Sequence, residues 1–342
     1  MRGVAALCVL LFHGPELVRP FSAVHGYLAV DIFFILSGFV IARTYERRLA
    51  ERGVAWFLRE RLIRLHPIYL AGLVLGIVVA LLQFVTKANH TLSPATIGAA
   101  AVSGFFMLPS WLTDEKLKLF PLDYPAWTLF FELAINIVYA FTYRWWNVRL
   151  LAAVVALCAA LLSYAAYDLG SLDHGALWND AWCGVARVGF GFPVGVLIYK
   201  LNVSFRVPSW GSPLIVTAVA ALLCASAHHV LYDLFVVFVA APVVVVLGAQ
   251  CKTPRSLCSS YEFVGEASYA LYALHVPLLA ICLPLLKQKV GIELDVRVGA
   301  VVLAVFVVGA FFVTRWYDAP VRRLLKAWST RRYGDGGRRD GT

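Results

Sequence analysis

Repeated apolar stretches of nearly bilayer length are the strongest constraint on how this chain can fold. Four of them are Leu70–Val85, Leu150–Ala166, Ser212–Ala227 and Val298–Thr314. A helix needs about 20 apolar residues to cross the hydrocarbon core of a membrane. The composition agrees, because 61% of the residues are apolar, only 15% are charged, and the mean hydropathy is +0.77. Since soluble proteins carry more charge in shorter apolar runs, we predict an all-α, polytopic membrane protein.

The basic residues predict how the chain is threaded. The stretch from Arg43 to Arg64 holds seven Arg against three Glu, and the tail from Arg322 to Arg339 holds six Arg and one Lys. Because Lys and Arg concentrate in cytoplasmic loops, we expect both termini in the cytoplasm and therefore an even number of crossings. Eleven apolar segments are visible, and residues 95–112 form the weakest. We predict ten transmembrane helices, with residues 95–112 re-entrant or lying on the surface.

Residues 1–320 are expected to form one transmembrane domain, and residues 321–342 a basic, disordered cytoplasmic tail. The net charge of +10 is explained by the cytoplasmic loops, so we expect membrane lipid and not nucleic acid as a partner. The seven cysteines are scattered singly, which predicts neither a disulfide framework nor a metal site. Arg2 and the apolar run after it resemble a signal peptide, but no small-x-small cleavage site follows, so we expect a retained first helix.

Five ionisable residues lie at membrane depth, on different predicted helices. A charge there costs roughly 2.5–3.5 kcal/mol even on the lenient insertion scale, so such groups usually face a cavity or a partner. Taken singly, each has a structural interpretation, such as an ion pair or a hydrogen-bonded packing histidine. Taken together they predict a polar site inside the membrane. They are His13, Asp31, Glu132, Arg187 and His275.

The spacing of neighbouring polar residues refines this site. Arg2 and His13 are eleven residues apart, which puts them on one helical face about 16 Å apart. An imidazole suits proton transfer near neutral pH, so His13 is a candidate catalytic residue. Arg61 and Arg64 share a helical face and suit phosphate binding. By spacing alone, however, a role of these two arginines in topology or lipid-headgroup contact is the simpler interpretation.

The order of these residues resembles the acyltransferase-3 family, whose members are polytopic membrane O-acyltransferases. The resemblance rests on six segments that span the chain. They are "RGVAALCVLLFH" with Arg2 and His13, "GYLAVDIFFILSGF" with Asp31, "RLIRLHPIY" with Arg61 and Arg64, "WTLFFE" with Trp127 and Glu132, "SYALYALHVP" with Ser268, Tyr272 and His275, and "YDAP". Thr128 replaces the usual Ser, and Asp318 replaces the usual Glu.

The resemblance implies a function and a set of roles. The donor would be acyl-CoA, in particular acetyl-CoA, entering from the cytoplasm, with Arg61, Arg64 and Arg2 on its phosphates. His13 would take the proton of an acceptor hydroxyl, directly or after holding the acyl group, and Glu132 or Asp31 would orient it. The acceptor would be a polysaccharide, a glycan or a lipid-linked sugar. Further residues that we expect to line the site are Trp127, Ser268, Tyr272, His275 and Arg187.

We therefore expect a multi-pass O-acyltransferase of the cytoplasmic (inner) membrane that needs no metal. It would act alone or with a separate extracytoplasmic or export-system partner, and its oligomeric state stays open. Two alternatives remain at this point. One is a proton-coupled transporter, although no internal repeat is visible. The other is a non-catalytic subunit of a polysaccharide export system.

Overall fold

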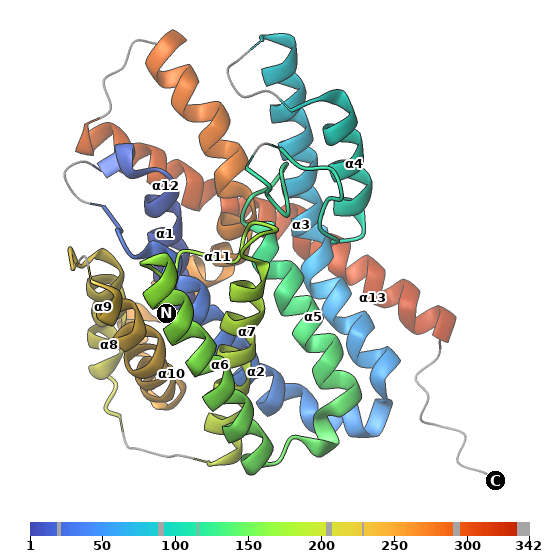
Figure 1. The fold of residues 1–342 in the computed structure, drawn as a ribbon, viewed down its shortest axis with the longest axis vertical. Coiled ribbons are helices and arrows are strands. Elements are labelled where there is room, and N and C mark those ends of the chain that lie inside the picture. Colours follow the sequence, from blue (N-terminus) through green and yellow to red (C-terminus); the bar gives the residue numbers. More distant parts are fainter. Residues whose placement is uncertain are drawn as a thin grey trace.

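A computed structural model describes residues 1–18, 22–87, 92–114, 116–202, 207–227, 229–289 and 295–333. These residues form one bundle of helices (Figure 1). In chain order the α-helices are α1 (Arg2–His13), α2 (Ala29–Arg52), α3 (Val54–Val85), α4 (Pro94–Phe105), α5 (Ala126–Thr142), α6 (Val148–Leu169), α7 (Ala181–Lys200), α8 (Gly211–Cys224), α9 (Val230–Phe235), α10 (Ala241–Gln250), α11 (Arg255–Pro284), α12 (Val296–Val313) and α13 (Ala319–Tyr333).

Eight helical stretches in the described part of the chain are long and apolar enough to cross a membrane. They contain α2, α3, α5, α6, α7, α9 with α10, α11, and α12 with α13. The protein is thus all-α and polytopic, as predicted. The two remaining predicted crossings contain α1 and α8, which have only 12 and 14 residues. At 1.5 Å per residue they are about 18 and 21 Å long, shorter than a hydrocarbon core of about 30 Å.

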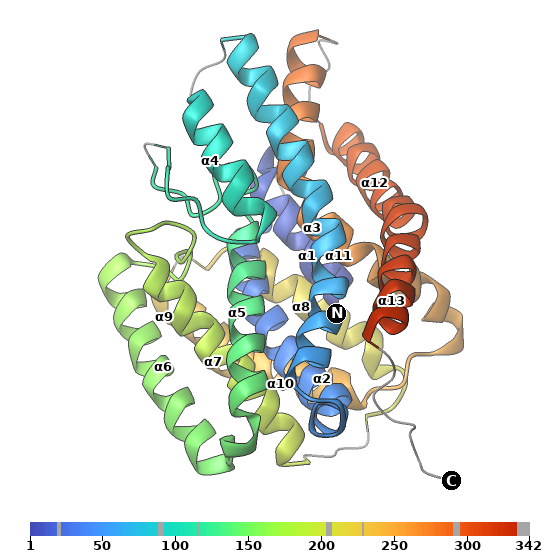
Figure 2. The same ribbon diagram turned by 90° about the vertical axis from the view of Figure 1, so that its right-hand side faces the viewer.

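Two connections lie at one end of the bundle, and one of them belongs to the basic stretch 43–64 that we predict to be cytoplasmic. The connections α2–α3 and α5–α6 are both at the lower end in the two perpendicular views (Figures 1 and 2). Gly53 makes the first of these turns with a φ of 82°, a conformation that residues with a side chain rarely adopt. The N-terminus, in contrast, lies at mid-height of the bundle in both views.

Helix α2 is the most buried of the long helices and packs closely on α7. Glycines on both helices make this approach possible. A Cβ atom on Gly38 would come within 2.0 Å of the Phe192 carbonyl oxygen, and one on Gly195 within 2.1 Å of the Ile35 carbonyl oxygen. Small residues at such contacts are typical of membrane helix pairs. Helix α1 packs on α11, and α11 also contacts α3 and α12.

Two sequence predictions concern short segments. Residues 94–105 form the 12-residue helix α4, which packs on α3 and is too short to cross a membrane; whether it is re-entrant or superficial stays a prediction. The tail differs from the expected disorder, because residues 321–333 belong to α13. This helix forms an ion pair with α3, in which Lys326 Nζ lies 2.9 Å from Glu60 Oε2. Residues 334–342 lie outside the described part.

The side of the membrane on which the loops lie can be tested by cysteine labelling on a cysteine-free background. We expect Leu117→Cys to react with an impermeant maleimide only from the extracytoplasmic side, and Arg149→Cys only from the cytoplasmic side. Both positions are exposed in the structure. The reverse pattern would mean that residues 95–112 form a true crossing.

Candidate active site

A cavity of about 270 Å³ lies between α1, α2, α3, α5 and α11. Arg2 lines it from the start of α1, Arg61 and Arg64 from adjacent turns of α3, and Glu132 from α5. We call it the arginine cavity. Part of its wall, Thr44, Tyr45, Arg61 and Arg64, belongs to the basic stretch 43–64 that we predict to be cytoplasmic. The rest of its wall is mixed, with Ser37, Thr128, Ser268 and Tyr269 among its polar residues and Val30, Phe33 and Leu129 among its apolar ones.

The charges in this cavity are unbalanced. Glu132 is engaged, since its Oε1 accepts hydrogen bonds from Arg61 Nη2 at 2.9 Å and from Ser37 Oγ at 2.8 Å. Within the described residues Arg2 and Arg64 form no ion pair, although Arg64 lies 6.0 Å from the ring centre of Tyr269. Three guanidinium groups thus face one carboxylate, which leaves an excess of two positive charges. Such a cavity favours an anionic ligand.

A second, smaller cavity of about 30 Å³ surrounds His13 at the other end of α1. We call it the histidine pocket. Its wall comes from α1, from the start of α2 and of α5 with the residues before each, from the loop between α6 and α7, and from Tyr272 of α11. The residues that matter below are Phe12, His13, Tyr27, Tyr124, Trp127, Asp173 and His174.

The hydrogen bonds around His13 assign its tautomer. His275 lies beside it, 1% exposed, and donates from Nδ1 to the Tyr272 carbonyl oxygen at 2.6 Å. This leaves His275 Nε2 as an acceptor, 3.2 Å from His13 Nδ1. His13 Nδ1 also lies 3.0 Å from the Val9 carbonyl oxygen. Because both neighbours of Nδ1 accept, Nδ1 carries the proton and Nε2 keeps a free lone pair, which is what a general base or nucleophile needs.

The two cavities share part of their walls. Val30 and Tyr272 line both of them. The Tyr272 hydroxyl is hydrogen-bonded to Thr128 Oγ1 at 2.6 Å, and its ring makes an edge contact with Phe33 at 5.5 Å between ring centres. The two cavities are thus neighbours that meet at Val30 and Tyr272.

Asp31 and Arg187 form a buried pair behind the histidine pocket, each 1% exposed. Arg187 donates from Nε to Asp31 Oδ1 at 3.1 Å and from Nη2 to Asp31 Oδ2 at 2.6 Å. It also donates to the carbonyl oxygens of Tyr27 at 2.7 Å and His174 at 3.2 Å. Its guanidinium carbon lies 5.5 Å from the ring centre of Trp127, which lines the pocket.

The structure brings most of the predicted site residues to the two cavities. Arg2, Arg61, Arg64, Glu132, Ser268 and Tyr272 line the arginine cavity, and His13, Trp127 and Tyr272 line the histidine pocket. His275 contacts His13 directly. Glu132 contacts Arg61 rather than His13, and Asp31 contacts Arg187 rather than His13. The catalytic and binding roles of all these residues stay predictions.

Sequence reasoning missed several wall residues. Tyr27 and Ser37 lie within the segment "GYLAVDIFFILSGF". Because this segment is mostly apolar, its pattern predicts a membrane helix and does not single out these two residues. Asp173 and His174 are further wall residues that no motif indicates. Both lie in a loop, where no periodicity predicts which side chains reach a site. Among the described residues, no three His, Cys, Asp or Glu side chains lie close enough to hold a metal ion.

Comparison with known proteins identifies the family. Residues 1–316 match the family model described as an acyltransferase domain, Acyl_transf_3, over nearly the whole chain. The chain belongs to the acyltransferase-3 family. It is therefore a multi-pass membrane acyltransferase, and this membership argues against a transporter and against a non-catalytic subunit.

Three relatives are similar to this acyltransferase. Protein 2 in the picA locus of Rhizobium radiobacter is 35% identical over 180 residues, which cover 49% of this chain and 92% of the relative. Acyltransferase MdmB of Streptomyces mycarofaciens is 25% identical over 88% of this chain and 82% of its own length. The exopolysaccharide production protein ExoZ of Rhizobium meliloti (strain 1021) is 23% identical over 94% and 96%. No solved structure matches this chain.

The Asp31–Arg187 pair can be tested as a structural element. Asp31→Asn leaves a buried guanidinium without its counter-charge, so we expect a loss of about 3–5 kcal/mol in the free energy of unfolding, seen as a clearly lower melting temperature in detergent. Replacing both partners, as Asp31→Leu with Arg187→Met, should recover much of the loss. Glu51→Gln, which breaks the exposed Arg47–Glu51 pair, should cost less than about 1 kcal/mol. Equal melting temperatures for Asp31→Asn and Glu51→Gln would contradict this account.

Proposed function

We propose that this acyltransferase transfers an acyl group, in the simplest case acetyl, from cytoplasmic acyl-CoA to a hydroxyl group of a polysaccharide, a glycan or a lipid-linked sugar. It would do so in the cytoplasmic membrane. The observation that carries the proposal is that a cationic cavity on the predicted cytoplasmic side meets the pocket of His13 at Val30 and Tyr272. The name of the relative ExoZ, an exopolysaccharide production protein, supports an acceptor of the carbohydrate class.

Acyl-CoA fits the arginine cavity by charge and by shape. Its phosphates are anionic, and Arg2 and Arg64 are the cations of the cavity that form no ion pair within the described residues. Arg61, held by Glu132, adds a fixed third guanidinium. CoA is elongated, and Arg2 and His13 stand about 16 Å apart along α1. With the phosphates at Arg2 and Arg64, the thioester would point past Val30 and Tyr272 toward His13.

The reaction then follows from the tautomer of His13. An acceptor hydroxyl enters the histidine pocket from the opposite side and donates to His13 Nε2. As Nε2 takes this proton, the oxygen attacks the thioester carbonyl carbon and forms the ester bond. The carbon–sulfur bond breaks, and the thiolate of CoA receives the proton back from Nε2. In the alternative sequence, Nε2 itself attacks the thioester and an acyl-histidine passes the group to the hydroxyl.

His275 and Glu132 take supporting roles in this proposal. His275 Nε2 accepts from His13 Nδ1 and so keeps the lone pair of His13 on Nε2, and it can stabilise the imidazolium as it forms. Glu132 orients Arg61 instead of touching the imidazole. The acceptor need not be free in solution, because a separate extracytoplasmic or export-system protein would present it to the site.

The catalytic half of the proposal is tested with His13→Ala. We expect acyl transfer from acetyl-CoA to be abolished, while the dissociation constant for CoA, measured by calorimetry in detergent, stays within about threefold of wild type. The reason is that the imidazole acts on the reacting atoms and adds little to ground-state binding. If His13→Ala still transferred the acyl group from acetyl-CoA, His13 would not be the catalytic residue.

The binding half is tested with Arg64→Ala. A charge-assisted hydrogen bond contributes about 1.5–3 kcal/mol, so the affinity for CoA should fall by about tenfold or more and should become less sensitive to salt. Arg64→Lys should recover part of it, because a point charge replaces the planar fork. Arg47→Ala is the matched control, an exposed arginine of the same basic stretch, paired with Glu51. If Arg64→Ala and Arg47→Ala bound CoA with equal affinity, Arg64 would not bind its phosphates.

A further inference from the structure

Three side chains of the histidine pocket offer hydrogen-bond acceptors. His13 has its Nδ1 proton engaged, so Nε2 accepts. His174 donates from Nδ1 to Asp180 Oδ2 at 3.0 Å, so its Nε2 also accepts. Asp173 lines the pocket, is exposed, and its carboxylate has no hydrogen-bond or ion-pair partner among the described residues.

Two hydroxyls near the pocket are engaged elsewhere, whereas the Tyr124 hydroxyl and the Trp127 indole N–H line the pocket as neutral donors without a hydrogen bond among the described residues. The Tyr27 hydroxyl donates to Asp233 at 2.8 Å, and the Tyr272 hydroxyl is paired with Thr128. No lysine or arginine lines the pocket in the described part of the chain. Arg187, the cation behind the wall, is turned to Asp31 and to the carbonyl oxygens of Tyr27 and His174. An anionic group would find a carboxylate here and no free cation.

The remaining wall is aromatic. Phe12, Tyr27, Tyr124 and Trp127 line the pocket, and the rings of Phe12 and Tyr27 meet edge to face at 5.5 Å between centres. Flat apolar faces beside a few acceptors suit a molecule with C–H faces and O–H edges. The pocket holds about 30 Å³, so the reacting hydroxyl and its carbon enter, and the rest of the molecule stays at the mouth beside exposed Asp173.

We propose that the histidine pocket is an acceptor subsite for a neutral, polyhydroxylated ring, and that it rejects rings that carry a phosphate or carboxylate near the reacting hydroxyl. Asp173 and His174 are the recognition residues, which accept from ring hydroxyls next to the one at His13. This inference rests on the proposed function. It adds that the acceptor is neutral and names the residues that recognise it.

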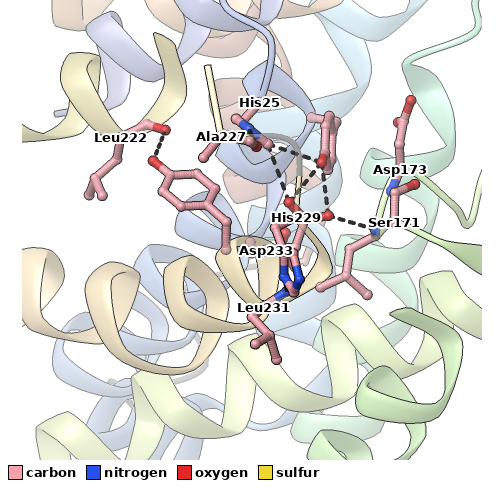
Figure 3. Close-up of polar contacts among 12 residues, drawn as sticks. His25, Ser171, Asp173, Leu222, Ala227, His229, Leu231 and Asp233 are labelled. Carbon is pink, nitrogen blue, oxygen red and sulfur yellow. Dashed lines mark hydrogen bonds and ion pairs between the residues drawn. The ribbon is translucent and has the colours of Figure 1, made fainter. Parts of the chain in front are cut away.

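A buried cluster on the same side holds this subsite in place (Figure 3). Asp233, 2% exposed, accepts from the Tyr27 hydroxyl at 2.8 Å and from the Leu172 amide at 2.9 Å. His25 lies 3.2 Å from Asp233 through Nδ1 and donates from Nε2 to the Ala227 carbonyl oxygen at 2.7 Å. One carboxylate thereby fixes both the Tyr27 ring and the backbone directly before Asp173, so Asp233 and His25 are positioning residues.

Protection of His13 from chemical modification tests the binding step without requiring acyl transfer. Diethyl pyrocarbonate acylates accessible imidazoles, and mass spectrometry of the peptide that contains His13 gives the rate. With purified protein in detergent, methyl α-glucopyranoside should slow modification of His13 at least threefold, and glucose 6-phosphate at equal concentration should not. Equal protection by both sugars, or by neither, would overturn the proposal.

Variants of Asp173 connect the binding to the residue. In Asp173→Asn the concentration of methyl α-glucopyranoside needed for half-protection should rise by about tenfold, because a charged acceptor is lost. In Asp173→Lys, glucose 6-phosphate should begin to protect. Asp168→Asn, an exposed carboxylate at the end of α6, is the matched control and should behave as wild type. Identical curves for Asp173→Asn and Asp168→Asn would refute the role of Asp173.

The same preparations separate this inference from the proposed function. CoA binding by calorimetry and release of free thiol from acetyl-CoA are measured beside the protection assay. Charge-selective protection without CoA binding or thiol release would leave the subsite standing and reject the acyl-CoA proposal. CoA binding and thiol release without charge-selective protection would do the opposite.

Discussion

The Asp31–Arg187 ion pair is the contact on which the arrangement of this membrane domain depends. A guanidinium that is 1% exposed can stay charged there only if its donors are matched, and the contacts to Asp31, Tyr27 and His174 match them. Removing one partner of such a pair costs far more than the pair contributes as a whole. The pair therefore acts mainly by making one relative placement of α2 and α7 acceptable, a placement that the glycines of both helices allow.

This placement of α2 and α7 also positions the wall of the histidine pocket. Arg187 fixes the backbone of Tyr27 and of His174, and its guanidinium lies against Trp127. All three residues line the histidine pocket. Asp233 fixes the Tyr27 side chain and the Leu172 amide from the other direction. The Asp31–Arg187 pair and Asp233 thus hold one wall of the histidine pocket. The single short helix α1 places Arg2 in the arginine cavity and His13 in the histidine pocket.

Much of this could be predicted from the sequence where helical geometry alone decides. The register of Arg2 and His13, the shared face of Arg61 and Arg64, and Thr128 with Glu132 in one cavity all follow from 3.6 residues per turn. The pairing of Glu132 with Arg61 does not follow, because it depends on how α3 packs on α5. The same holds for Asp173 and His174, which a loop brings to the pocket. Segment length misled in two places, since the apolar runs that contain α1 and α8 form helices shorter than a bilayer.

The central claim is that one elongated donor spans both cavities along α1, and a cryo-electron microscopy structure with a non-transferable acetyl-CoA analogue tests it most directly. The account predicts density that begins at Arg2 and Arg64 with the phosphates, passes Val30 and Tyr272, and ends with the acyl carbonyl at hydrogen-bond distance from His13 Nε2. Density for the analogue outside the arginine cavity, or an acyl group that ends on the cytoplasmic side of Tyr272 and away from His13, would contradict it.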